Sequence, residues 1–331
     1  MKNTFADILN RLATEAKLHT SNLYLLSKMD QASLGVFRDI WPTIPEQRRR
    51  DIMQELVEIS EVNFEVSFDP VFLLGLGDED AEVRAQAING LWENENPALI
   101  GPLLHLLHTD ETALVRAAAA IALGQFLYLS EIEELEAEKT APIKEALLAT
   151  IHQPGEDIEV RRRAIESIAF LSDAAITKII ENAYYDDDEK MQVSAIFAMG
   201  RNADRRWKSR VMTELDNDNS EISFEAARAC GELELKEAVP TLIALINNPS
   251  TDLEVQEMAI WALGRIGGDM ARDALEEYLD GSNEALAEAA EAALDELNLF
   301  SENFDMFDFS DDGLDDDDFF DEDEDDEDDF N

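Results

Sequence analysis

The four histidines and the single cysteine are the residues of this chain best suited to acid–base, nucleophilic or metal chemistry. His105 and His108 stand three positions apart, a spacing that places two imidazoles on one face of a helix, where they can bind a metal. They lie within Leu-Leu-His-Leu-Leu-His, and this leucine-rich context favours a helix-packing role instead. Cys230 has no second cysteine with which to form a disulfide or a Cys-X-X-Cys site, so we expect a buried structural thiol.

One acidic stretch near the C-terminus resembles the start of a calcium-binding loop. Asp308-Phe-Ser-Asp-Asp-Gly313 supplies oxygen ligands and a turn glycine, but its twelfth position is Phe319, where a bidentate glutamate is required. The chain also lacks a P-loop, a dinucleotide-binding glycine motif and a nucleophile elbow. We therefore expect that the protein is not an enzyme and has no cofactor and no dedicated metal site.

Clusters of basic residues are rare in a chain with 75 acidic and 26 basic residues and a net charge of −49, so each cluster is a candidate anion site. Arginine triplets occupy 48–50 and 161–163. A third cluster surrounds Trp207, and we interpret it as a docking site for anions or for the chain's own acidic tail: Arg201, Arg205, Arg206, Lys208 and Arg210. The alternative is solvated faces and ion pairs between neighbouring repeats. Direct nucleic-acid binding is not expected, because it requires an excess of clustered lysine and arginine.

A repeated pattern predicts the elements that position these residues. Seven times an Asn, Asp or Thr is followed three residues later by an apolar anchor, and four residues after the anchor by alanine. The anchors are Val83, Val115, Val160, Met191, Ile222, Val255 and Leu286, and the alanines are Ala87, Ala119, Ala164, Ala195, Ala226, Ala259 and Ala290. Successive anchors lie 32, 45, 31, 31, 33 and 31 residues apart, which indicates one insertion, near 128–140. This period is typical of a solenoid of stacked helical pairs.

Each anchored segment has the signals of an α-helix. The residue three before the anchor is a good N-cap, and the anchor, the alanine and the residue eight after the anchor share one face. Gly124, Gly200, Gly231 and Gly264 come next, and we expect them to form left-handed C-terminal caps. A second amphipathic helix precedes each anchored one, so the fold is predicted to be all-α. The small alanine lets neighbouring helices approach closely.

These residues match a known family. The run from Asp252 to Gly267, Asp-Leu-Glu-Val-Gln-Glu-Met-Ala-Ile-Trp-Ala-Leu-Gly-Arg-Ile-Gly, resembles the second helix of HEAT repeats and, more narrowly, the bacterial phycobilisome-lyase HEAT-like subtype. Asp78–Arg84 and Thr109–Arg116 carry the same Asp-rich turn and Val-Arg pair. The resemblance covers about residues 70–297 and implies a right-handed α-solenoid that serves as a binding scaffold. Some HEAT-like proteins are di-iron hydroxylases built on His-Glu pairs, but no histidine here is followed by glutamate.

The resemblance also implies that the second helix of each pair lines the concave side of the solenoid. The residue six after the anchor faces away from the anchor stripe, and in three successive repeats it is Phe197, Arg228 and Trp261. Phe224 lies between the two other rings in the stack. We interpret Phe197, Phe224 and Trp261, with Arg228 and Arg162 beside them, as a partner-binding patch. The alternative is that neighbouring helices cover the three rings.

The chain divides into three regions. Residues 1–70 depart from the repeat and are interpreted as an N-terminal helical cap, 71–298 as a solenoid of about seven repeats, and 299–331 as a disordered acidic and aromatic tail. The N-terminus lacks a signal-peptide pattern, and the apolar runs fall short of the roughly 20 residues that span a bilayer. We therefore expect a cytoplasmic, bacterial monomer with no membrane span.

The tail carries much of the negative charge. No lysine or arginine follows Arg272, and 18 acidic residues lie between Glu302 and Asp329. Such a run repels itself and buries too little to fold. Phenylalanines such as Phe304 and Phe309 alternate with the acids. Three interpretations stay open: a solubilising segment, a binder of basic partners such as ribosomal proteins, and a mask docked on the chain's own basic residues.

The sequence favours a non-enzymatic scaffold or adaptor that binds a protein partner on the concave face, with the tail as its modulator. Two alternatives are a chromophore-lyase-type activity, as in the relatives that attach or remove bilins, and an acidic chaperone for basic proteins. Replacing Phe197 and Trp261 by serine is expected to abolish partner capture without unfolding the protein.

Overall fold

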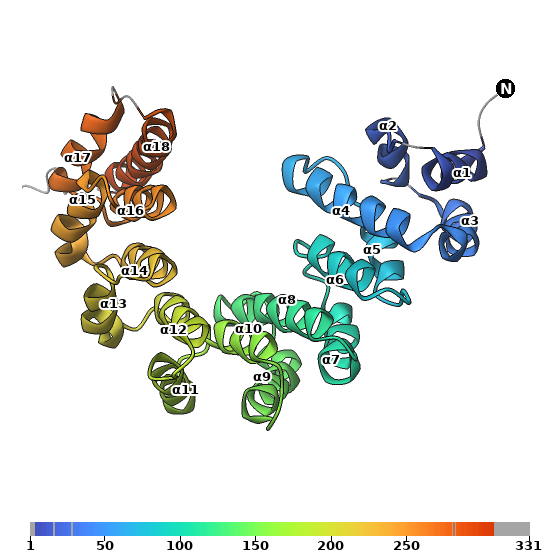
Figure 1. The fold of residues 1–331 in the computed structure, drawn as a ribbon, viewed down its shortest axis with the longest axis horizontal. Coiled ribbons are helices and arrows are strands. Elements are labelled where there is room, and N and C mark those ends of the chain that lie inside the picture. Colours follow the sequence, from blue (N-terminus) through green and yellow to red (C-terminus); the bar gives the residue numbers. More distant parts are fainter. Residues whose placement is uncertain (1–3, 16, 28, 280, 282, 308–331) are drawn as a thin grey trace, which may run out of the picture.

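A computed structural model describes residues 4–15, 17–27, 29–279, 281 and 283–307, and for 300–307 it describes the backbone alone. The helices follow one another along an open arch (Figure 1), and no strand occurs in these ranges. The helices of the N-terminal region are α1 (Phe5–Thr14), α2 (Thr20–Leu23), η1 (Tyr24–Leu26), α3 (Gln31–Ile40), η2 (Trp41–Thr43) and α4 (Glu46–Val62).

The repeat region contains the remaining helices. They are α5 (Asp69–Gly75), α6 (Ala81–Gly90), η3 (Pro97–Leu99), α7 (Ile100–Thr109), α8 (Ala113–Glu131), α9 (Ala137–His152), α10 (Ile158–Ile168), α11 (Ala174–Tyr184), α12 (Glu189–Arg201), η4 (Arg205–Trp207), α13 (Lys208–Glu214), α14 (Ser220–Glu232), η5 (Lys236–Ala238), α15 (Val239–Asn247), α16 (Leu253–Ile266), α17 (Asp269–Leu279) and α18 (Glu284–Phe307).

Two layers of helices form the arch. The even-numbered helices from α4 to α18 stack on one another along its inner side, and from α7 to α17 each odd-numbered helix packs on the even-numbered helix that follows it (Figure 1). We call the inner row the inner wall. The predicted all-α solenoid is confirmed, and the anchored helices are the ones that form this wall.

The predicted repeat positions form the core between successive inner helices. All seven anchors, all seven alanines and the seven residues eight after the anchors are buried. The side chains of Asp80, Asp157, Asp188 and Asn219 accept hydrogen bonds from backbone N–H groups of the helix that follows each of them. Thr112 and Asp252 differ, since their side chains make no cap hydrogen bond. Burial of one apolar stripe per helix therefore holds the stack together.

The glycines at the ends of the anchored helices have a different role from the predicted one. Gly200, Gly231 and Gly264 lie inside helices and do not adopt a positive φ. A Cβ atom built on Gly231 would lie 3.0 Å from Ala262 Cα, and one on Gly264 would lie 2.9 Å from the Ala293 carbonyl oxygen. Glycine is present there because the next inner helix passes too closely for a side chain. The prediction of left-handed caps was wrong, because close helix packing and not a turn requires these residues.

The region 1–70 and the insertion join the solenoid continuously. The inner helix α4 packs on α6 in the same way that α6 packs on α8, so the stack begins inside the region interpreted as a cap. The insertion lengthens helices: α8 has 19 residues and α9 has 16, whereas α12 and α14 have 13 each. At the other end, α18 continues to Phe307, past the predicted boundary at residue 298, and residues 308–331 lie outside the described part of the chain.

Helix α8 is the one described helix that is long and apolar enough to cross a membrane by length and composition. An 18-residue window of this helix has a mean hydropathy of 1.5, and half of that window is buried. Because α8 packs against α6, α7, α9 and α10, its apolar residues are explained by helix packing.

Leucine at position 195 is expected to destabilise the stack. Ala195 is completely buried on α12, and three additional carbon atoms would force α12 away from its neighbours. Overpacking of this kind reduces the free energy of unfolding by about 1–3 kcal/mol. Urea unfolding followed by circular dichroism measures the change. Ala292→Leu is the matched control, because Ala292 is exposed on α18 and the same enlargement there should change stability by less than about 0.5 kcal/mol.

Candidate functional site

The predicted partner-binding residues all lie on helices of the inner wall. Phe197 is on α12, Phe224 and Arg228 on α14, Trp261 on α16 and Arg162 on α10. Phe197, Phe224 and Arg162 line one cavity of about 280 Å³. Trp261 does not line it, because its ring packs beside Gly231 at the end of α14. Phe224 and Trp261 are partly buried against the core, so neighbouring helices cover a part of these rings.

Phe197 is the centre of a stack of rings and guanidinium groups. The Arg201 guanidinium carbon lies 4.3 Å from the Phe197 ring centroid and 4.5 Å from that of Phe170. On α14, the guanidinium carbon of Arg228 lies 4.2 Å from the Phe197 centroid. We call Phe170, Phe197, Arg201, Phe224 and Arg228 the aromatic–arginine strip. Such contacts hold cations over ring faces by electrostatic attraction to the π-system.

Acidic side chains pair with most of the arginines around the strip. Arg228 forms an ion pair with Glu232 at 3.1 Å. Next to it, Arg163 pairs with Glu166 at 2.7 Å. The buried Arg162 donates to Ser194 Oγ at 2.8 Å and pairs with Glu159 at 3.0 Å. The contact between Arg162 and Ser194 joins α10 to α12, whereas the three ion pairs each lie within one helix, α10 or α14.

Arg201 differs from those arginines. Its Nη1 donates to the carbonyl oxygen of Glu166 at 3.3 Å, and no carboxylate lies within ion-pair distance of it in the described part of the chain. Burial lowers the pKa of Arg201 to about 10, and repulsion by Arg228 adds to this effect. The guanidinium is still charged at neutral pH, because this pKa lies well above 7.

Glu225 is the acidic counterpart of Arg201 in this site. Burial raises its pKa to about 7, and the negative charges of Glu166 and Glu232 act in the same direction. Arg228 opposes the shift, but its Nη1 atom lies 3.6 Å from Glu225 Oε2, too far for a hydrogen bond. Glu225 Oε2 is buried with no hydrogen-bond partner. The carboxyl group is therefore half protonated near neutral pH.

The five residues predicted as an anion or tail-docking cluster do not lie together. Arg201 is on the inner wall, whereas Arg205, Arg206, Lys208 and Arg210 belong to η4 and α13 in the outer layer. There Arg206 pairs with Asp204 at 2.6 Å, Lys208 with Glu237 at 2.5 Å and Arg210 with Glu181 at 3.0 Å. The pairs of Lys208 and Arg210 match the alternative interpretation, ion pairs between neighbouring repeats, whereas Arg206 pairs within its own repeat. Among the described residues neither Arg201 nor the exposed Arg205 forms an ion pair, and of these two Arg201 lies on the inner wall.

The residues considered for catalysis form no reactive group. Both histidines of α7 are exposed, so the predicted packing role is wrong: the intervening leucines face the core, and His108 Nδ1 is 2.7 Å from the Leu104 carbonyl oxygen. Cys230 is free and buried, and burial raises its pKa to about 12. No group of three or more potential metal ligands occurs among the described residues, and the calcium-like stretch at 308–319 lies outside them.

The stacked hairpins define an α-solenoid, and its inner wall carries a row of partly exposed aromatic and arginine side chains. A model of HEAT repeats matches residues 70–143, 174–253 and 209–295, which together exceed half of the chain. The chain belongs to the HEAT-repeat family, and the predicted family is confirmed. HEAT repeats are typical of protein-interaction scaffolds.

Solved structures with a similar fold have low sequence identity to this chain. Human deoxyhypusine hydroxylase is 15% identical with a TM-score of 0.35, over 89% of this chain and 96% of that one. The complex of CpcE and CpcF of phycocyanin lyase from Nostoc sp. PCC7120 gives 18% identity and a TM-score of 0.45, over 69% of this chain and 94% of that one. Importin beta gives 13% identity and a TM-score of 0.43, over 87% of this chain and 46% of that one. No curated protein matches the sequence.

Proposed function

We propose that the protein is a non-enzymatic scaffold that binds an extended segment of a protein partner on its inner wall. The observation that carries this proposal is the position of Phe197, which is partly exposed on the inner wall between the guanidinium groups of Arg201 and Arg228. Aromatic and arginine side chains dominate the energetics of protein interfaces. The cavity beside Phe197, about 280 Å³, provides space for one side chain of a partner.

Phe197→Ser is expected to reduce partner capture at least tenfold and to leave the fold intact. The ring is partly exposed and does not belong to the apolar core, so its loss removes a binding anchor and little packing. Trp261 is less suitable for this test than the sequence indicated, because its ring packs beside Gly231. Affinity purification with quantitative mass spectrometry measures the loss of each co-purifying protein.

Phe64→Ser is the matched control for this substitution. Phe64 is 76% exposed just after α4 and belongs neither to the aromatic–arginine strip nor to the lining of its cavity, so the same chemical change there should leave the set of partners unchanged. Equal losses for both variants would show that general surface apolarity causes capture. A fall of many degrees in the melting temperature of Phe197→Ser would show instead that the ring belongs to the core.

The acidic C-terminal segment is proposed to control access to the inner wall. Its 18 acidic residues between Glu302 and Asp329 attract basic partners over a distance set by the ionic strength. A basic partner would be released as the salt concentration rises, which a salt series in the same purification measures. The segment could also control access in a second way, by occupying the inner wall of its own chain.

A further inference from the structure

A second hollow of the inner wall adjoins the aromatic–arginine strip. It has a volume of about 360 Å³ and is lined mainly by Trp92, Ile121, Tyr128 and Phe170. Trp92, Ile121 and Tyr128 are 49%, 51% and 45% exposed, which is unusual for large apolar side chains so close together. We call this hollow the apolar groove. It lies between α6, α8 and the residues that follow α10.

Arg201 places a positive charge at one end of the apolar groove. Its guanidinium stacks on Phe170, whose ring lies 5.3 Å from that of Tyr128, so the cation and the apolar lining form one continuous surface. The neighbouring arginines Arg163 and Arg228 each have a carboxylate partner, and Arg201 has none in the described ranges. A ligand that fits carries a carboxylate beside an aromatic or aliphatic side chain.

The C-terminal segment of this chain has that chemistry. Residues 308–331 alternate runs of Asp and Glu with Phe309, Leu314, Phe319, Phe320 and Phe330. They follow α18, which is the last helix of the inner wall (Figure 1). An extended chain of these 24 residues reaches up to about 80 Å. Since it is covalently attached, the segment is present at a high effective concentration near the wall.

We propose that residues 308–331 bind in the apolar groove of their own chain, with a phenylalanine ring against Trp92 and Ile121 and an adjacent carboxylate on Arg201. This proposal rests on the proposed function, since the segment would then mask the wall that a partner must occupy. A partner gains access only by displacing the segment. Capture therefore requires that the partner bind the wall more tightly than the attached segment does.

Disulfide trapping in the full-length chain tests this placement. Cys230 is buried, so introduced cysteines are the reactive thiols. One variant combines Gln125→Cys, in the groove, with Ser310→Cys, in the segment. The matched control combines Ser209→Cys, exposed on the outer helix α13, with the same Ser310→Cys. Diamide oxidises each thiol pair to a disulfide and is itself reduced to the hydrazine, and gel mobility separates cross-linked monomers from dimers.

The expected result is that the intramolecular disulfide forms at least about tenfold faster at Gln125→Cys than at Ser209→Cys. Arg201→Gln and 0.5 M salt should each reduce the rate at Gln125→Cys toward that of the control. Arg205→Gln removes an exposed positive charge from the outer layer and should leave the rate unchanged. Ile121→Glu places a negative charge at an exposed position of the groove and leaves the residues of the aromatic–arginine strip unchanged. It should slow disulfide formation at Gln125→Cys as much as Arg201→Gln does.

Equal rates at the two positions, or a Gln125→Cys rate that is indifferent to Arg201→Gln and Ile121→Glu, would overturn the proposal. Cross-linked dimers that increase with protein concentration would also overturn it, because they would assign the groove to the segment of a second copy. No partner protein is present in this experiment. A negative result therefore leaves the proposed scaffold function standing, whereas that function fails if Phe197→Ser retains full capture.

Discussion

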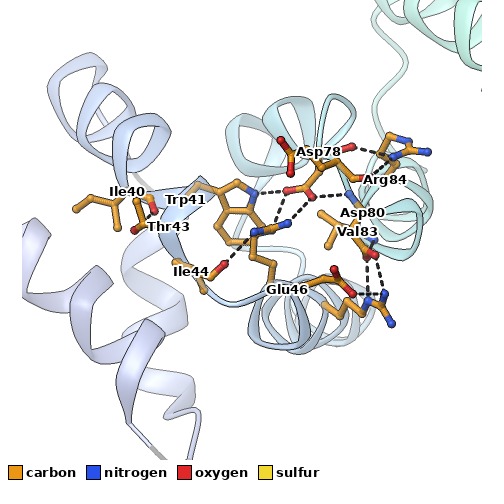
Figure 2. A network of polar contacts seen from close by, with 12 residues as sticks. Ile40, Trp41, Thr43, Ile44, Glu46, Asp78, Asp80, Val83 and Arg84 are labelled. Atoms are coloured by element: carbon orange, nitrogen blue, oxygen red, sulfur yellow. Dashed lines mark hydrogen bonds and ion pairs between the residues drawn. The ribbon is translucent and has the colours of Figure 1, made fainter.

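Asp78→Ala is expected to reduce the free energy of unfolding by about 3–5 kcal/mol, because it removes the acceptor that joins the N-terminal helices to the first repeat. Asp78 lies in the turn between α5 and α6, and its side chain is 4% exposed. Its carboxylate accepts from Trp41 Nε1 at 2.7 Å, from Arg49 Nη2 at 3.1 Å and from the backbone N–H of Asp80 at 2.9 Å (Figure 2). Alanine would leave the Arg49 charge buried without a counterion.

The measurement is urea unfolding with tryptophan fluorescence and circular dichroism as separate probes. Trp41 is 5% exposed and lies in this network, so we expect its environment to loosen first, which would make the two probes diverge. Glu79→Ala is the matched control: Glu79 occupies the same turn but is exposed, and its removal should change stability by less than about 0.5 kcal/mol. Similar losses for both substitutions would contradict a specific role for Asp78.

The same type of contact recurs along the first repeats. Arg84 donates to both carboxylate oxygens of Asp110, in the turn of the next repeat, at 2.7 and 2.9 Å. Arg116 in turn pairs with Glu156 at 2.6 Å. The Val-Arg pair was recognisable in the sequence as a mark of the family, but its partner was not, because the pairing depends on the distance between one turn and the next. These buried pairs link successive repeats and set their spacing.

The repeat register was predictable because one apolar stripe per helix must be buried. The seven anchors and their alanines are all buried, as the pattern requires. The choice of exposed positions was less successful. The residue six after the anchor is Phe197 and Arg228 in the site, but in the preceding repeat it is Glu166, which is 5% exposed. Glu166 is buried because α10 packs on α12, where Ser194 donates to its carboxylate at 2.6 Å, and a one-dimensional pattern does not show which side chains a neighbouring helix covers.

A second row, ten residues after the anchors, carries the part of the site that the sequence did not reveal. It contains Phe170, Arg201 and Glu232 in successive repeats, followed by Arg265 and Glu296, which pair at 3.1 Å. The signal was present as alternating charge at the repeat period. A helical wheel does not assign a face to Phe170, Arg201 or Glu232, because these three residues lie at or beyond the ends of their helices. Arg201 was therefore grouped with its sequence neighbours in the outer layer instead of with Phe170.

Glu225→Gln is expected to remove a pH dependence from the stability of the inner wall. The folded-state pKa of Glu225 is about 7, against 4.5 for the free side chain, and burial is the main cause. Below pH 4.5 the group is protonated in both states, and its favourable contribution is complete. As the pH rises, the unfolded state releases its proton first, so the contribution declines and is lost once the pH passes the folded pKa near 7.

The size of this effect follows from the shift, about 1.4 kcal/mol for each unit of pKa. Between pH 5 and pH 8 the wild-type protein should therefore lose about 2–3 kcal/mol relative to Glu225→Gln, which cannot ionise. Urea unfolding of both proteins at a series of pH values measures the difference. Glu221→Gln, an exposed position on the same helix, is the matched control and should give a curve parallel to wild type. Parallel curves for Glu225→Gln would show that its carboxyl group is solvated and titrates normally.

The same titration would change the charge of the binding surface at neutral pH. Glu225 acts on Arg201 and Arg228, and its ionisation adds a negative charge next to the guanidinium groups that flank Phe197. A carboxylate ligand at Arg201 should therefore bind more tightly at pH 6 than at pH 8, and this dependence should vanish in Glu225→Gln. The disulfide-trapping rate at the groove, corrected for thiol ionisation with the Ser209→Cys control, reports this difference. If the ratio of the trapping rates at Gln125→Cys and Ser209→Cys stays constant with pH, the ionisation of Glu225 has no effect on ligand binding.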